Sequence, residues 1–168
     1  RTIKQLNSTI IKGKANDMEF ALSLPTQVIA DTKNTNSDYV TCSLPELQFN
    51  FLKCVRQGKN VVITATFKNN SNKEYSVCSG NKNATVYDNE GESYEFDRDA
   101  SFLGKNRWIS YDGITLLCGV PMKATFVIPN VSTSATDFSV IKIPFTYYYN
   151  DNSTEQFIEF RNLPISAQ

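Results

Sequence analysis

The sequence predicts an all-β fold, from three observations. The chain of 168 residues is rich in residues that favour strands, with 11 Phe and 8 Tyr in addition to many Val, Ile and Thr. No long segment repeats apolar residues with the 3.6-residue period of a helix, whereas several short segments alternate apolar and polar residues. Polar turn sequences separate these segments. At this length we expect one domain, which can bury roughly 68–70% of the surface of the unfolded chain.

The N-terminal part contains one predicted strand. Residues 1–16 are polar with scattered Ile and Leu, and we interpret them as an N-terminal tail, so the domain is expected to span residues 17–168. Residues 17–24 alternate in the manner of a half-buried strand, and Pro25 ends it. The residues on the apolar side of this strand are Met18, Phe20, Leu22 and Leu24.

Two strands joined by a tight turn are predicted next, over residues 47–55 and 61–67. The connection over residues 57–60 contains Gly58, which can adopt a positive φ, and such a short turn predicts a hairpin. The residues expected to face the core are Leu47, Phe49, Phe51 and Val55 in the first strand, and Val61, Ile63, Ala65 and Phe67 in the second.

A second hairpin is predicted from residues 85–88 and 93–96, which flank the turn sequence Asn-Glu-Gly over residues 89–91. The following insert, residues 97–113, has no clear pattern, and residues 107–109 fit either a short strand or a loop. Because the surrounding sequence specifies a scaffold, we expect any functional contact to lie in this insert.

The C-terminal part contains three more predicted strands. They cover residues 122–128, residues 138–149 with an interruption at Pro144, and residues 156–162. The whole chain thus contains eight or nine short predicted strands, separated by turn sequences. This spacing is typical of an antiparallel β-sandwich of immunoglobulin-like type.

The composition excludes several classes of function. The 17 Lys and Arg balance the 17 Asp and Glu, which argues against the basic surface that nucleic acid binding requires. No apolar run approaches the ~20 residues of a transmembrane helix. Histidine is absent, which rules out a Ser-His-Asp triad, a Cys-His pair and a histidine metal cluster. We therefore expect a protein that is not an enzyme and has no cofactor.

Clustered acidic residues at Asp88, Glu90, Glu92 and Glu95 have three interpretations. Paired carboxylates can act in glycoside hydrolysis, and carboxylate oxygens can bind calcium. The cluster lacks the twelve-residue pattern of a calcium loop. We therefore favour a solvated hairpin turn, and keep Asp88, Glu90 and Glu92 as weak candidates for a metal site.

Four cysteines are candidates for disulfide bonds. An even number of cysteines suggests at least one bridge in an exported protein, and the alternative is a set of reduced thiols that pack as small apolar residues. The absence of closely spaced pairs argues against a structural zinc site. The four cysteines are Cys42, Cys54, Cys78 and Cys118.

Two groups of aromatic residues are candidates for a binding surface, because aromatic side chains provide a large contact area. The first is Trp108 with Tyr111, which we select as ligand-binding candidates because they lie in a polar segment. The alternative is that Trp108 packs in the core or anchors its loop. The second group is the run of tyrosines over residues 147–149, in which alternate residues share a face, so one side is expected to be core.

Three segments together resemble a known family. They are residues 62–71, which end in Asn-Asn-Ser, the hairpin over residues 87–94, and residues 117–129, which begin Leu-Cys-Gly-Val-Pro. These segments resemble the telokin-like, immunoglobulin-like domains of unknown function found in exported bacterial lipoproteins. The resemblance covers residues 47–163. It departs from the family pattern at residues 119–121, where Gly-Val-Pro replaces Pro-Gly-Glu.

The resemblance implies a sandwich fold and a secreted or cell-envelope location, with a lipid anchor on a removed N-terminal segment as one form of attachment. It implies no catalytic residues. The expected function is a non-enzymatic module for adhesion, assembly or protein binding at a bacterial cell surface. The alternative is a carbohydrate-binding accessory domain, so the expected partner is a protein or a glycan.

Overall fold

The computed structural model describes residues 10–15, 18–23, 39–108, 113–150 and 152–167. The chain forms two compact units, residues 1–33 and 34–168, so the division lies later than the predicted boundary after residue 16. In the first unit, strands β1 (Ile10–Ala15) and β2 (Met18–Ser23) pair as an antiparallel hairpin. The strand predicted over residues 17–24 is therefore present, but its partner lies in the segment predicted to be a tail.

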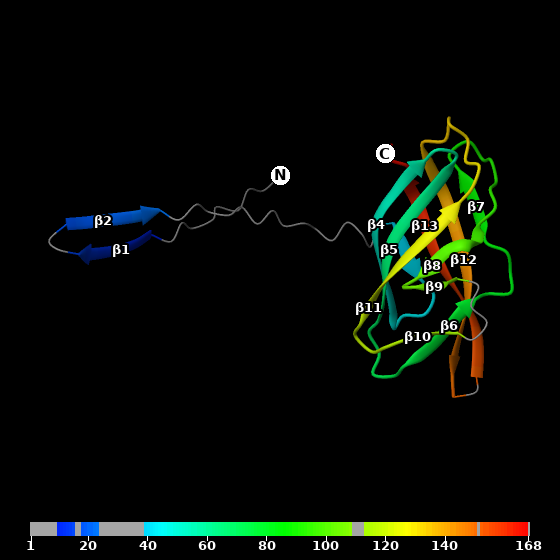
Figure 1. Ribbon diagram of the computed structural model, residues 1–168, viewed down its shortest axis with the longest axis horizontal. Helices are drawn as coiled ribbons and strands as arrows, with labels where there is room; N and C mark the ends of the chain where they lie inside the picture. The colour runs from blue at the N-terminus through cyan, green and yellow to red at the C-terminus, as the bar shows by residue number, and fades with distance from the viewer. Residues whose placement is uncertain (1–9, 16–17, 24–38, 109–112, 151, 168) are drawn as a thin grey trace. The chain divides into compact units, whose positions relative to one another are not determined.

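The larger unit consists of two antiparallel sheets (Figure 1). The described residues contain no helix, so the all-β prediction is confirmed, and none of them form a helix that could cross a membrane. The first sheet, called the β12 sheet, has the order β10-β6-β12-β13-β3, with β7 also paired to β12. The second, called the β5 sheet, has the order β4-β5-β11-β8-β9.

The strands of the larger unit outnumber the eight or nine predicted, with six in one sheet and five in the other. The additional strands include β3, β9 and β10, which are too short for an alternating pattern to reveal them. The strands of the β12 sheet are β3 (Val40–Cys42), β6 (Tyr75–Ser79), β7 (Thr85–Asp88), β10 (Ile114–Leu116), β12 (Asp137–Tyr149) and β13 (Asn152–Pro164). Those of the β5 sheet are β4 (Leu47–Gln57), β5 (Asn60–Asn69), β8 (Asp97–Leu103), β9 (Asn106–Arg107) and β11 (Pro121–Ile128).

The hydrophobic core lies between the two sheets. Aromatic side chains of opposite sheets touch there: the ring centroids of Phe67 and Phe145 are 6.1 Å apart, and those of Phe126 and Phe160 are 6.2 Å apart. In β5 and β11 alternate residues are buried, as a pleated sheet with one covered face requires. Strand β5 follows the prediction fully, because its four predicted core residues are completely buried: Val61, Ile63, Ala65 and Phe67.

Strand β4 departs from the predicted alternation. Leu47 and Phe49 are buried as expected, but the pairing with β5 shifts between Phe51 and Lys53. Such a β-bulge adds one residue and moves every later side chain to the opposite face. Cys54 is therefore buried in place of Val55, and the prediction that Val55 faces the core is wrong.

Pro144 does not interrupt its strand, because β12 runs continuously through it. Strand β7 pairs with β12 over residues 138–142, and β6 pairs with it over residues 145–148. Pro144 lies where these two neighbours meet. Its carbonyl accepts the Gly80 N–H at 3.1 Å, and the N–H that proline lacks would be on that same side. The predicted interruption thus coincides with a change of partner strand.

The second predicted hairpin forms only in part. Its first arm is β7. The second arm contributes a single bridge, between Tyr87 and Ser93, before β8 begins at Asp97, and two hydrogen bonds flank this bridge, from the Asp88 N–H to the Glu92 carbonyl and from the Tyr94 N–H to the Val86 carbonyl. Strand β7 instead finds its main partner in β12. The turn between the arms nevertheless closes as expected, with a φ of 85° at Gly91.

Candidate functional site

Trp108 is part of the core and is only 1% exposed. Its ring packs edge-to-face on Phe126 at 5.2 Å, and its backbone N–H donates to the Ser101 carbonyl at 2.8 Å. The prediction that Trp108 provides a binding surface is therefore wrong, and the alternative, that it packs in the core, is confirmed. Tyr111, the other predicted ligand-binding residue, lies outside the described residues.

Asp88 is buried, and its carboxylate is used by the turn that follows it. One oxygen accepts the N–H groups of Glu90 at 2.8 Å and Glu92 at 3.0 Å, and the other accepts the Tyr94 hydroxyl at 2.6 Å. Burial alone would raise the pKa of Asp88, but these hydrogen bonds outweigh it and hold the pKa below its ordinary value. These contacts support the turn interpretation over a metal site built on Asp88, Glu90 and Glu92.

The four cysteines are free thiols, so the structure does not contain the disulfide that their even number suggested. Cys54 faces the core, whereas the sulfur of Cys78 lies 3.5 Å from the Tyr148 hydroxyl and Cys118 is exposed on the loop after β10. Burial raises the pKa of Cys42 to about 11 and that of Cys54 to about 12. Protonated, buried thiols of this kind behave as small apolar residues.

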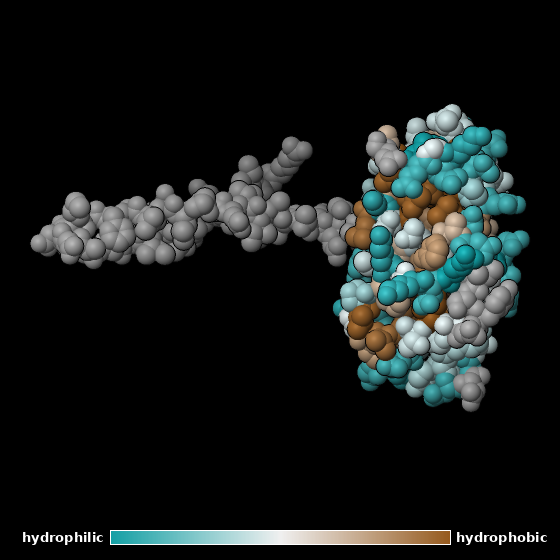
Figure 2. All heavy atoms as spheres, in the orientation of Figure 1, coloured by the Kyte–Doolittle hydropathy of each residue, from teal (hydrophilic) through white to brown (hydrophobic). Residues whose placement is uncertain are grey.

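A few large apolar side chains are exposed on the larger unit. On the face shown in Figure 2, hydrophilic side chains surround small groups of apolar ones. Two of the exposed large apolar residues are tyrosines of the β12 sheet. Among the described residues, the exposed large apolar side chains are Leu52, Tyr87, Leu117, Val120 and Tyr148.

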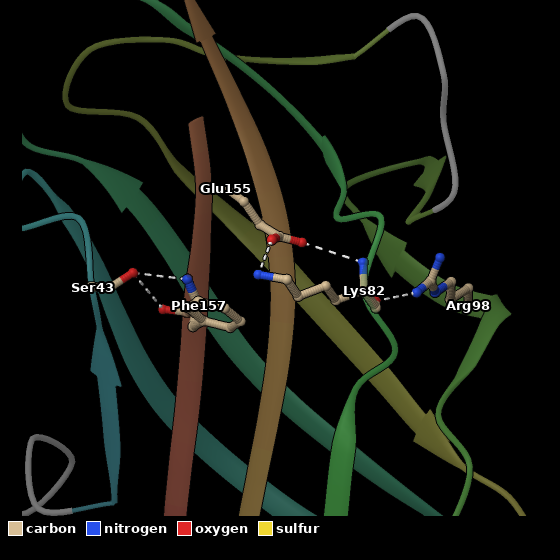
Figure 3. A network of polar contacts seen from close by, with 5 residues as sticks. All are labelled: Ser43, Lys82, Arg98, Glu155 and Phe157. Carbon is tan, nitrogen blue, oxygen red and sulfur yellow. Dashed lines mark hydrogen bonds and ion pairs between the residues drawn. The ribbon is translucent and has the colours of Figure 1, made fainter. Parts of the chain in front are cut away.

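A group of charged and aromatic side chains lies on β12, β13 and the neighbouring loops, and Arg98 reaches it from β8 of the β5 sheet (Figure 3). Because alternate residues of a strand point to opposite faces, Phe157 is outside while its neighbour Ile158 is in the core. We call this group the outer face. Its residues are Ser43, Lys82, Arg98, Lys142, Glu155 and Phe157.

The ring of Phe157 lies between two lysine side chains. The Lys142 ammonium is 4.4 Å from the ring centroid and that of Lys82 is 5.6 Å from it. Both distances are within the range of a cation–π contact, whose strength grows when water is excluded. A partner that covered Phe157 would therefore strengthen contacts that already exist.

Lys82 is also held by Glu155. The two side chains form an ion pair at 2.7 Å, and the Lys82 backbone N–H donates to the same carboxylate at 3.2 Å. These contacts with Lys82 lower the pKa of Glu155. Lys82 remains largely exposed, so this pair contributes little to stability and more to the position of the two charges.

Two further hydrogen bonds tie distant segments to this group. The Arg98 guanidinium donates to the Lys82 carbonyl at 2.5 Å, and the Phe157 N–H donates to the Ser43 hydroxyl at 2.8 Å (Figure 3). Ser43 in turn donates to the Gln156 side chain at 2.6 Å. These hydrogen bonds link β13 to the loop after β3, to the loop between β6 and β7 and, through Arg98, to β8 of the β5 sheet.

The outer face combines an aromatic ring, two ammonium groups and a carboxylate within mutual contact. Sequence reasoning found only part of it: the alternation in the last strand places Phe157 opposite Ile158, but nothing in the spacing of Lys82 and Lys142 shows that they meet at Phe157.

Comparisons with known proteins identify no relative of this chain: no protein-family model matches it, and neither does any curated protein. Its function is therefore inferred from its own residues.

Proposed function

We propose that this chain is an exported, non-enzymatic, immunoglobulin-like module that binds another protein at a bacterial cell surface through the outer face. The observation that carries the proposal is the ring of Phe157, positioned between Lys82 and Lys142 beside the Lys82–Glu155 ion pair. The resemblance of residues 47–163 to domains of exported lipoproteins supports the location.

The arrangement suits a protein partner for two physical reasons. Aromatic and cationic side chains that become fully covered dominate the energy of protein interfaces. Side chains that are already ordered lose little conformational entropy on binding, and Phe157 is ordered by two lysines and by its place on the sheet. Charges of both signs at the edge of the ring would orient the partner and make association depend on salt concentration.

The test uses a photo-crosslinking amino acid in place of Phe157, in the full chain added to the envelope fraction of bacterial cells. The same substitution at Leu52, an exposed apolar residue of the β5 sheet, is the matched control. We expect a protein that crosslinks only from position 157. The purified partner should then bind Phe157→Ala about tenfold more weakly and Leu52→Ala with unchanged affinity, and a tenfold loss corresponds to about 1.4 kcal/mol.

Two results would contradict the proposal. The first is crosslinking that is the same from positions 157 and 52. The second is a purified partner whose affinity is unchanged by Phe157→Ala and by Lys142→Glu, because this pair of changes removes both the ring and one of its two cations.

A further inference from the structure

A hollow of about 370 Å³ lies at one end of the β12 sheet and shares no lining residue with the outer face. Its lining residues come from β6, from β10 and from the end of β12, and β6 pairs with both of these strands. Its volume is at the lower end of the range for small-molecule sites, roughly 300–1,000 Å³. We call it the tyrosine hollow, after Tyr75, Tyr148 and Tyr149 in its walls.

The aromatic walls of the tyrosine hollow are held rigidly. Tyr75 is 6% exposed and packs edge-to-face on Tyr147 at 5.6 Å and on Tyr149 at 5.8 Å. Tyr148 takes the opposite face of β12 and is 42% exposed. Tyr75 and Tyr149 therefore lie on the core side of the sheet, and the ring that the hollow presents to a ligand is that of Tyr148, on whose face a flat ligand can stack.

The rim of the hollow is polar and can both donate and accept hydrogen bonds. Glu74 offers a carboxylate, Asn150 an amide, and Ser76 and Thr115 hydroxyl groups. Three of these residues are exposed, so their polar groups are open to a ligand: Glu74, Thr115 and Asn150. A ligand that matches this rim carries several hydroxyl groups around a ring.

The charges near the hollow select against ionic ligands. The Lys73 ammonium lies 4.7 Å from the centroid of the Tyr149 ring, so the chain itself already fills that cation–π position. A cationic peptide would meet this ammonium, and an anionic ligand would meet the Glu74 carboxylate. With the Glu74 carboxylate in the hollow and the Lys73 ammonium near it, a neutral ligand meets the least electrostatic repulsion.

We infer that the tyrosine hollow binds a neutral sugar, with one face of the sugar ring on Tyr148 and its hydroxyl groups bonded to Glu74, Thr115 and Asn150. This site is separate from the outer face and does not depend on the proposed protein contact. It gives the module a second ligand of a different chemical class.

Saturation-transfer NMR tests the inference on the full chain with four neutral methyl glycosides at millimolar concentration: those of glucose, galactose, mannose and N-acetylglucosamine. We expect at least one of them to receive saturation. Tyr148→Ala should weaken its binding about tenfold, or about 1.4 kcal/mol. Tyr148→Phe keeps the ring and should bind like the natural chain, and Phe157→Ala on the outer face should also bind normally.

A second variant covers the case in which Tyr148→Ala does not fold. Glu74→Gln changes an exposed side chain without altering the Tyr148 ring, and it should weaken binding of the same glycoside by removing its charged acceptor. The inference would be overturned if no neutral glycoside bound, if only an oligolysine peptide or a sialylated sugar bound, or if Tyr148→Ala and Glu74→Gln both bound normally.

Discussion

Replacing Asp88 with alanine removes the acceptor of three hydrogen bonds at once. A hydrogen bond to a charged group contributes about 1.5–3 kcal/mol, and an abandoned buried donor costs a similar amount. Glu90 and Glu92 are exposed, so water can replace part of what their N–H groups lose. We therefore expect the free energy of unfolding to fall by about 3–4 kcal/mol, which is less than the sum of three full hydrogen bonds to a charged group.

Two conservative variants separate the contribution of the Tyr94 hydrogen bond from that of the Asp88 charge. Tyr94→Phe removes only the hydroxyl that donates to Asp88 at 2.6 Å, and should cost about 1.5–2 kcal/mol. Asp88→Asn keeps the shape and one acceptor oxygen but loses the charge, and should cost about 2 kcal/mol. Urea unfolding at neutral pH measures each value, and Glu92→Gln, in an exposed side chain of the same turn, is the control.

The contribution of Asp88 to the free energy of unfolding should also depend on pH. The pKa of Asp88 is lower in the folded chain than in the unfolded chain, so its contribution is complete above the unfolded pKa, about 4. The contribution is lost as the pH falls through the folded pKa. The natural chain should therefore lose more stability than Asp88→Asn on acidification. Equal urea midpoints and equal pH profiles for the two proteins would show that the carboxylate does not hold the turn.

Two further predictions concern packing and thiol chemistry. Gly80→Ala should lower the free energy of unfolding by about 2–3 kcal/mol in urea, because the added Cβ would lie 2.7 Å from the Pro144 Cβ. Gly58→Ala meets no atom within 4 Å, so it should cost only the roughly 1–2 kcal/mol of its positive φ. Equal losses in the two variants would contradict this reasoning. Maleimide should label Cys118 in the folded chain and Cys54 only after unfolding, since Cys54 is 2% exposed with a pKa raised to about 12. Mass spectrometry that finds fewer than four alkylatable thiols in the unreduced protein would show that a disulfide exists after all.

Strands were predictable where the alternation of apolar residues is long and uninterrupted. The alternation from Val61 to Phe67 identified both a strand and its buried face, because nothing disturbs that register. The same reasoning failed at Val55, since a single inserted residue at a bulge has no signature in the pattern of apolar residues. It also failed at Pro144, because the exchange of β7 for β6 depends on tertiary pairing.

The candidate sites were less predictable than the fold. Trp108 lies in a polar segment, and only the packing of its ring on Phe126 shows that it is buried. The outer face depends on Lys82, Lys142 and Phe157, which are far apart in the sequence and meet because two strands and a loop place them together. The sequence shows the run of tyrosines over residues 147–149, but Tyr75, on which two of them pack, belongs to another strand.

The divided edge of β12 has a consequence for local opening. Strands β7 and β6 protect separate lengths of the same edge, and the loop between them carries Lys82, which the ion pair with Glu155 fastens to β13. The two lengths can therefore lose their amide protection independently. A partner on the outer face would contact both the loop and β13, and would thereby couple the opening of β6 to that of β7. Hydrogen exchange should therefore slow in both strands together when the partner binds.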